Sequence, residues 1–152
     1  MRADEPRPEF ARSVEAPQQT GRGAVHAIAA GAAEREALAT RFALLALDRL
    51  EAEVRLSCLE GGLVRLTATL AADVVQTCVV TLEPVPSRIE ESFTLLYGAS
   101  SDTREIVLDG EAETVEPLAG GRIDIGEAVA QQLSLVLDPF PRAAGASLDQ
   151  TD

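Results

Sequence analysis

The sequence predicts an α+β fold: an antiparallel sheet of about five to seven strands with two helices packed on it. Stretches in which apolar and polar residues alternate, typical of half-buried strands, fill the middle of the chain. Two stretches with apolar residues at helical spacing precede and follow them. At 152 residues, without an internal repeat, the chain fits one domain with its own hydrophobic core.

The first helix and the first strands are expected before residue 59. Residues 1–23 are rich in Pro, Gln, Gly and charge, so we expect a flexible segment with one edge strand at most. Residues 24–29 form the next strand. From Ala32 strong helix formers place Leu38, Phe42 and Leu45 on one face, which predicts a helix ending near 44–47. Residues 50–58 then alternate as in a half-buried strand.

A hairpin and a further strand are expected next. Glu-Gly-Gly at 60–62 supplies a turn, and a second alternating stretch continues from Val64 towards Cys78, which gives an antiparallel hairpin. Pro84 and Pro86 interrupt any ladder, so a turn is expected there. Residues 89–97 alternate again and form another strand.

The last third of the chain changes in composition. Residues 98–121 are rich in Ser, Gly and acids and are expected to form a mobile acidic loop with a short strand inside it. A helix begins at Asp124, which can cap it together with Glu127, and Asp-Pro-Phe-Pro at 138–141 ends it. Residues 143–152 are expected to form a disordered tail.

The charge limits the partners. The net charge is −12, and all 13 basic residues are Arg. An acidic protein repels the phosphate backbone, and 3% aromatic residues leave few side chains for base stacking, so broad contact with bare RNA is not expected. A local Arg cluster or a basic protein partner stays open. Because Lys and Asn, which have A-rich codons, are absent, we hypothesise a G+C-rich bacterial gene.

The cysteines and the apolar segments indicate the compartment. Two cysteines are too few for a disulfide scaffold or a self-contained zinc site, which favours a reducing compartment. No apolar segment follows the N-terminal arginines as in a signal peptide, and no run is long enough to cross a membrane. We therefore expect a cytoplasmic protein without membrane contact.

The residues that could carry chemistry are few. His26, the only histidine, is expected to be structural, and Cys58 to be a small buried hydrophobe. Cys78 lies where a strand meets a turn and is expected to be partly exposed. A thiol enzyme built on Cys78 and His26 is the least favoured alternative, since no acid or oxyanion motif stands near either residue. We expect no catalytic, metal or cofactor site and no small-molecule substrate.

Three stretches resemble the YceD family, also called large ribosomal RNA subunit accumulation proteins. They are EREALATRFAL at 34–44, QTCVVTLEPVPSRIEESF at 76–93 and IDIGEAVAQQLSLVLDPFPR at 123–142. The resemblance marks residues 24–142 as a single YceD-like domain. Many relatives carry a Cys-x-x-Cys pair at the second stretch and more cysteines near the end. Cys78 lacks these partners, so no metal role is carried over. Gln131 stands where the family often has an acid, which puts a charge-based role of that position in doubt.

The resemblance implies a non-enzymatic factor in large ribosomal subunit biogenesis that promotes accumulation of 23S ribosomal RNA. With the acidic charge, we expect contact through a ribosomal protein or assembly factor of the large subunit, while a local ribosomal RNA contact stays open. The alternative is a general protein-interaction adaptor unconnected to ribosomes. Candidate contact residues lie in the two proline-containing stretches, where the competing interpretation is turn and helix-stop architecture: Cys78, Glu83, Pro84, Val85, Asp138, Pro139, Phe140, Pro141 and Arg142. An exposed Phe140 would favour recognition.

Overall fold

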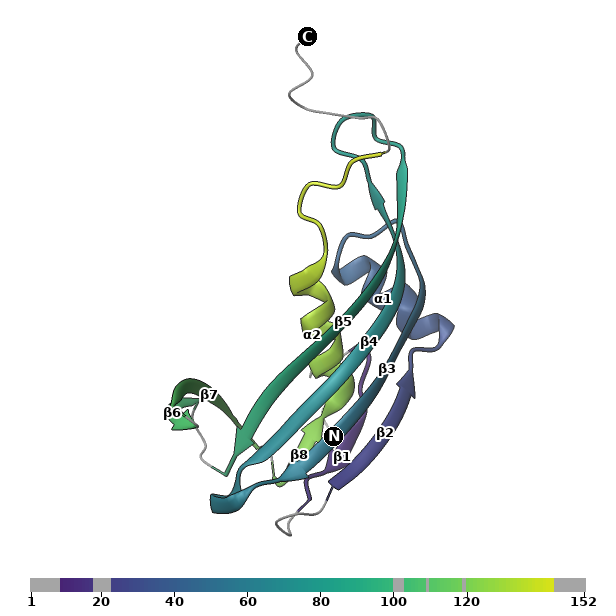
Figure 1. The fold of residues 1–152 in the computed structure, drawn as a ribbon. Coiled ribbons are helices and arrows are strands. Elements are labelled where there is room, and N and C mark those ends of the chain that lie inside the picture. Colours follow the sequence, from purple (N-terminus) through teal and green to yellow (C-terminus); the bar gives the residue numbers. More distant parts are fainter. Residues whose placement is uncertain (1–8, 18–22, 100–102, 109, 119, 144–152) are drawn as a thin grey trace.

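The computed structural model describes residues 9–17, 23–99, 103–108, 110–118 and 120–143. Long twisted strands form the main sheet, and both helices lie on one of its faces (Figure 1). Within the described residues this sheet has six strands in the order β2-β3-β4-β5-β7-β6. They are β2 (Gly23–Ala29), β3 (Ala46–Cys58), β4 (Val64–Thr77), β5 (Pro84–Gly98), β6 (Arg104–Leu108) and β7 (Glu111–Pro117). A separate pair joins β1 (Ser13–Glu15) to β8 (Arg122–Asp124). The helices are α1 (Ala32–Arg41) and α2 (Ile125–Val136), and η1 (Glu60–Gly62) is a 3₁₀ turn.

The α+β class and the helices on the sheet are confirmed, but the sheet is mixed rather than wholly antiparallel. Neighbouring strands are antiparallel except for β5 and β7, which pair in parallel where Leu96–Gly98 lies beside residues 115–117. The chain reverses once into β6 and again into β7, so β7 runs in the same direction as β5. The expected edge strand near the N-terminus is β1, and it pairs with β8 instead of the main sheet.

The central strands follow the alternation read from the sequence. The expected strands at 50–58 and 64–78 are β3 and β4, which pair in antiparallel register with Val54 opposite Ala68. Alternate residues of β4, from Val64 to Val74, are buried against the helices. The η1 turn that joins the strands holds Gly61 and Gly62 at φ 79° and 78°, a region that favours glycine.

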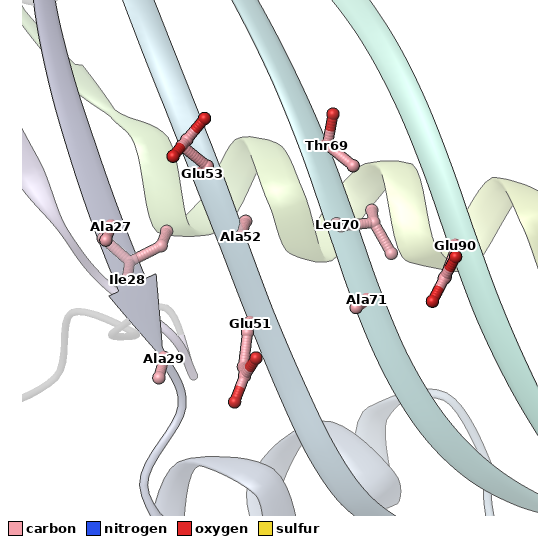
Figure 2. A pocket seen from close by; sticks show the side chains of 10 residues that line it. All are labelled: Ala27, Ile28, Ala29, Glu51, Ala52, Glu53, Thr69, Leu70, Ala71 and Glu90. Atoms are coloured by element: carbon pink, nitrogen blue, oxygen red, sulfur yellow. The ribbon is translucent and has the colours of Figure 1, made fainter.

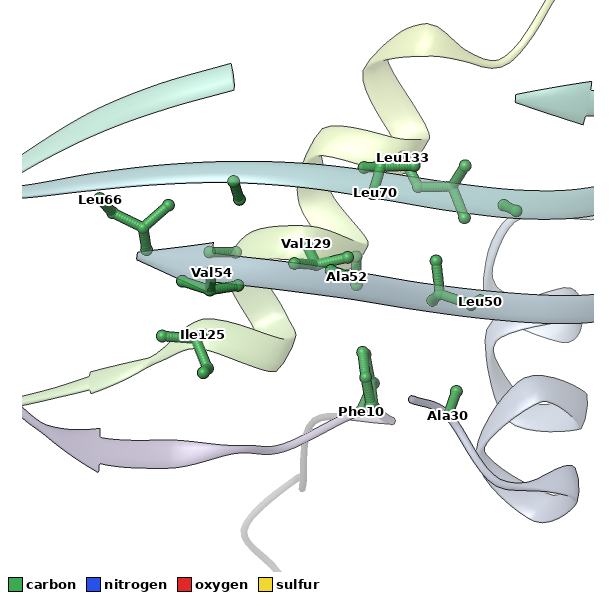
Figure 3. Packing of buried hydrophobic residues seen from close by; sticks show 14 of the residues in the cluster. Phe10, Ala30, Leu50, Ala52, Val54, Leu66, Leu70, Ile125, Val129 and Leu133 are labelled. Atoms are coloured by element: carbon green, nitrogen blue, oxygen red, sulfur yellow. The ribbon is translucent and has the colours of Figure 1, made fainter. Parts of the chain in front are cut away.

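The core fills the space between the sheet and the helices (Figure 3). It joins the inner faces of β3 and β4 to Leu38 of α1 and to Ile125, Val129 and Leu133 of α2. No polar or charged residue is buried in the described part of the chain. Phe10, which precedes β1, is 0% exposed, and burying such a side chain contributes about 1.5–3 kcal/mol. Residues 9–17, which were expected to be flexible, are therefore part of the folded domain.

Helix α1 ends at Arg41, before the expected end near 44–47. The Leu44 N–H donates to the Ala39 carbonyl oxygen and the Ala43 N–H to that of Thr40, while Ala43 has φ 56°. These bonds and the left-handed residue form a Schellman motif, in which glycine is the usual residue. Because alanine stands there, the sequence carries no stop signal. Leu45, expected on the helix face, is 56% exposed.

Helix α2 begins as predicted. The Asp124 carboxylate accepts hydrogen bonds from the main-chain N–H groups of Glu127, at 3.0 Å, and Arg12, at 2.8 Å. It therefore caps α2 and also fixes the N-terminal segment. The expected acidic loop at 98–121 instead contains the β6–β7 hairpin, with Gly110 at φ 82°. Neither helix in the described ranges is long and apolar enough to cross a membrane.

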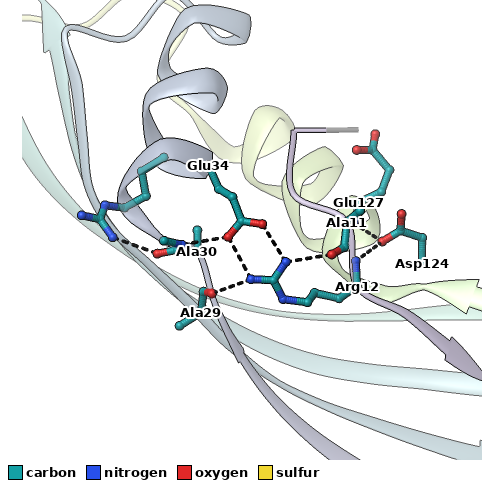
Figure 4. A network of polar contacts seen from close by, with 9 residues as sticks. Ala11, Arg12, Ala29, Ala30, Glu34, Asp124 and Glu127 are labelled. Carbon is teal, nitrogen blue, oxygen red and sulfur yellow. Dashed lines mark hydrogen bonds and ion pairs between the residues drawn. The ribbon is translucent and has the colours of Figure 1, made fainter. Parts of the chain in front are cut away.

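Figure 4 shows how Arg12 connects the N-terminal segment to both helices: its guanidinium pairs with Glu34 of α1, and its main-chain N–H bonds to Asp124 at the start of α2. The Arg12 guanidinium donates to both carboxylate oxygens of Glu34, at 2.7 and 2.8 Å, and to the Ala29 carbonyl oxygen, at 3.1 Å. Arg41 joins Glu9 to Glu127 at 3.0 and 2.9 Å. The hydrogen bonds from Arg12 lower the pKa of Glu34 to about 2. Residues 1–8 and 18–22 of the expected flexible segment at 1–23, and residues 144–152 of the expected tail at 143–152, lie outside the described residues.

Candidate functional site

The two proline-containing stretches predicted as contacts meet at one end of the molecule (Figure 1). The Val79 N–H donates to the Pro141 carbonyl oxygen at 2.9 Å. The Gln76 side-chain amide donates to the Asp138 carbonyl oxygen at 2.9 Å. Residues 78–83 between β4 and β5 and residues 138–143 after α2 thus form one surface, which we call the tip.

The turn in the tip comes before the prolines, not at them. The Cys78 N–H donates to the Glu83 carbonyl oxygen, and the Leu82 N–H donates to that of Cys78. Pro84 and Pro86 belong to β5 and pair with Thr77 and Val75 of β4. The sequence-based position of the turn is therefore wrong. In the described part of the chain β7 pairs with β5 only at Leu96–Gly98. The half of β5 that begins at Pro84 is therefore a sheet edge, where a residue without an N–H is tolerated.

Cys78 is 0% exposed, which corrects the expectation of a partly exposed thiol. Its sulfur accepts hydrogen bonds from the main-chain N–H groups of Val80, at 3.4 Å, and Thr81, at 3.3 Å. Burial by itself would raise the pKa of the thiol. Hydrogen bonds from the Thr81 side chain and from the main chain of Ala143, Thr81 and Val80 outweigh burial and lower the pKa to about 6. Cys78 therefore organises the turn around its sulfur and joins it to the segment after α2.

The outer surface of the tip is apolar and exposed. Phe140 is 64% exposed, which favours the recognition interpretation of this stretch. Leu82 is 75% exposed, and Val79 and Val80 are 39% and 38% exposed. These three residues were missed by the sequence reading, although an apolar Val-Val-Thr-Leu run inside a turn is a usable signal. Leu82 also has φ 65°, a strained conformation for a residue other than glycine.

The predicted contact residues divide into three groups by their burial. Cys78 and Pro141 are buried and hold the two segments together, and Val85 is half-buried. The others are exposed: Glu83, Pro84, Asp138, Pro139, Phe140 and Arg142. A groove of about 430 Å³ lies beside them, between the end of α1 and the segment that leaves α2. The tip thus offers both a projecting apolar surface and a neighbouring depression.

His26 and Cys78, the residues of the thiol-enzyme alternative, are far apart in the fold. His26 pairs with Val54 in β3, which lies opposite Ala68 of β4. From Ala68 to the end of β4 beside Cys78 is about 30 Å at roughly 3.3 Å per residue. The two residues therefore do not form a Cys–His pair. Cys58 is 6% exposed, as predicted for a small buried hydrophobe. Within the described ranges, no three His, Cys, Asp or Glu residues cluster as metal ligands would.

Comparison with known proteins identifies the family. The model of the family described as "Large ribosomal RNA subunit accumulation protein YceD" matches residues 66–151, more than half of the chain. The match begins in β4, includes α2 and both segments of the tip, and leaves the similar stretch at 34–44 outside. No curated protein matches the chain, and no solved structure does. The chain belongs to the YceD family, as its second and third stretches predict.

Proposed function

We propose that the chain is a non-enzymatic, cytoplasmic factor in large ribosomal subunit biogenesis that promotes accumulation of 23S ribosomal RNA through a protein contact at the tip. The description of its family supports the ribosomal role. One observation supports a protein contact at the tip. Two segments far apart in the sequence, both inside the family match, join there and expose apolar side chains at one end of the molecule.

A protein partner suits this surface better than RNA. Phosphate recognition requires several cationic side chains, whereas the described part of the tip carries a single arginine, Arg142, beside the acidic Glu83 and Asp138. The exposed Phe140 is an aromatic side chain of the kind enriched at protein interfaces, and the exposed Leu82 extends the apolar surface around it. The net charge of −12 further favours a basic protein over a nucleic acid. The partner we propose is a ribosomal protein or assembly factor of the large subunit.

The proposal is tested by isolating the tagged chain from its own cells, with and without nuclease treatment. Large-subunit proteins that remain after nuclease support the proposal. Large-subunit ribosomal RNA that is lost on nuclease treatment would indicate direct RNA binding instead. If only proteins unrelated to ribosomes are recovered, the general interaction adaptor becomes the better explanation.

A matched pair of variants assigns the contact to the tip. Phe140→Ala removes an exposed apolar side chain from the tip. Val107→Ala removes one that is 74% exposed on β6, away from the tip. We expect Phe140→Ala to reduce recovery of the ribosomal partner, while Val107→Ala leaves it unchanged. Equal recovery with both variants would place the contact elsewhere on the chain.

A further inference from the structure

The face of the main sheet opposite α1 and α2 carries a groove of about 560 Å³ (Figure 2). In the described part of the chain no helix or strand covers this face. Small side chains from β2 and β4 form the floor of the groove, and carboxylates from β3 and β5 stand around it. The residues concerned are Ala27, Ala29, Ala71, Glu51, Glu53 and Glu90.

One side of this groove is bounded by β2, an edge of the sheet. Within the described residues β2 pairs only with β3. The Ala30 N–H, directly after β2, donates to the Leu50 carbonyl oxygen. Since main-chain groups of antiparallel strands turn alternately towards and away from the partner, those of Val25 and Ala27 face away from β3. Among the described residues, the group that bonds to the outward side of β2 is the Arg12 guanidinium, which donates to the Ala29 carbonyl oxygen at 3.1 Å.

This edge lacks the features with which proteins block unwanted strand pairing. Natural edge strands carry charged residues or proline, or contain bulges. The β2 sequence Gly-Ala-Val-His-Ala-Ile-Ala has seven residues with no Asp, Glu, Lys, Arg or Pro, in a chain that is 25% charged. Val25 is 51% exposed on it. By contrast, β6 at the other edge carries Arg104 and Glu105. The β2 edge is therefore open to an added strand.

The groove determines which strand would fit. Glu53 and Glu90 have no ion-pair partner among the described residues, and the Glu51 carboxylate contacts Arg49 at 3.2 Å. The side chains of Ala27 and Ala29, between the edge and these carboxylates, are too short to block the way. A strand added to β2 would lie about 10 Å from β3, two strand spacings away. Long cationic side chains on its outer face would bridge that distance, with their aliphatic stems over the alanines.

We propose that an extended basic segment of a partner protein adds to β2 as a further strand and directs alternate Lys or Arg side chains over Ala27 and Ala29 to Glu53 and Glu51. This surface is distinct from the tip. The inference goes beyond the proposed function, because it holds whether or not the tip contacts a ribosomal component.

The test uses a synthetic fluorescent peptide of alternating Lys and Val, and a control peptide with Glu in place of Lys. Fluorescence anisotropy with the full chain measures their dissociation constants. Ala27→Pro removes an N–H that faces away from β3, so it blocks the edge without breaking the β2–β3 ladder. We expect it to weaken binding of the Lys peptide about tenfold or more. Circular dichroism checks that the variant is folded.

A second set of variants tests the charges. Glu53→Gln and Glu51→Gln are each expected to weaken binding of the Lys peptide about threefold. Glu36→Gln, at an exposed position on α1, should leave binding unchanged. The proposal also requires that the Glu peptide bind far more weakly than the Lys peptide.

Three outcomes would overturn the proposal. If the Lys peptide does not bind, the edge does not accept a basic strand. If the Ala27→Pro variant binds the Lys peptide as well as the unaltered chain does, the peptide binds through the net charge of the chain and does not add to β2. If size-exclusion chromatography shows a dimer that Ala27→Pro dissociates, the occupant is a second copy of this chain. None of these results depends on the ribosomal contact of the tip.

Discussion

Replacing Leu82 by glycine is expected to make the chain more stable. Leu82 lies in the turn of the tip at φ 65° and is 75% exposed. A left-handed conformation costs an L-residue roughly 1–2 kcal/mol, and the greater freedom of glycine in the unfolded chain costs about 0.5–1 kcal/mol. The exposed side chain gives up little packing. The net gain is about 0.5–1 kcal/mol, a rise in Tm of about 2 °C for a domain of this size.

Leu135 supplies the matched control. It is 76% exposed, nearly the same as Leu82, but lies in α2. Leu135→Gly should lower the stability by about 1 kcal/mol, because glycine is unfavourable inside a helix. Thermal unfolding of both variants is followed by circular dichroism. A fall in Tm for Leu82→Gly as large as that for Leu135→Gly would refute the argument from backbone strain.

The same variant separates stability from recognition. If the exposed Leu82 side chain contacts the partner, Leu82→Gly yields a more stable protein that recovers less of the ribosomal partner. Strained backbone that persists at a functional site commonly shows this trade-off. Unchanged recovery would remove Leu82 from the contact and leave Phe140 as the main anchor of the tip.

Three further predictions concern the core, the N-terminal ion pair and the buried thiol. Gly126→Ala should destabilise the fold by about 1–3 kcal/mol in urea unfolding, because the added Cβ would collide with the Phe10 carbonyl oxygen. Glu34→Gln should lower stability at neutral pH. Since the folded pKa of Glu34 is about 2, below its ordinary 4.5, this difference should persist above pH 4.5 and vanish as the pH falls through about 2. The pKa of Cys78 in the folded chain, about 6, lies below its ordinary 9. The Cys78 thiolate therefore stabilises the fold fully above about pH 9, and this contribution is lost as the pH falls through 6. Cys78→Ala should remove that pH dependence. In the native chain a thiol reagent should label Cys78 slowly, because its sulfur is buried, and fast labelling would revive the thiol-enzyme alternative.

Local sequence patterns predicted the central strands and the start of α2, since each depends on neighbours in the chain. The alternation around Val54 and Leu66 sets which side chains face the helices, and Asp124 caps α2 through a residue three positions away. The end of α1 was misplaced because its left-handed residue is Ala43, where glycine would have marked the stop. The turn was misplaced because Pro84 lies on a strand, which only the pairing of β5 reveals.

The acidic composition of residues 98–121 hid a hairpin. Asp-Gly at 109–110 is a strong hairpin signal, and the residues around it are strand formers interleaved with acids. The prediction of a loop followed from the Ser, Gly and acid content alone. The parallel pairing of β7 with β5 is a contact between segments well separated in the sequence, which local patterns do not encode.

The candidate site shows the same limit. The sequence and the family resemblance identified both segments of the tip, including Phe140. They did not show that the segments meet, because the bond between Val79 and Pro141 joins distant parts of the chain. The burial of Cys78 follows from that meeting, since the segment after α2 helps to enclose its sulfur. The groove beside β2 likewise depends on four strands and has no signature in any one of them.

We propose above that the tip supports accumulation of large-subunit ribosomal RNA through a protein contact. The most direct test replaces Val80 and Phe140 together by Ala in cells that lack the unaltered chain, with Val107→Ala as the control. The ratio of large- to small-subunit ribosomal RNA is then measured at equal protein levels. We expect the tip variant to lower this ratio as far as complete loss of the chain does, and the control to keep it normal. A normal ratio with the tip variant would show that the tip is not needed for this accumulation.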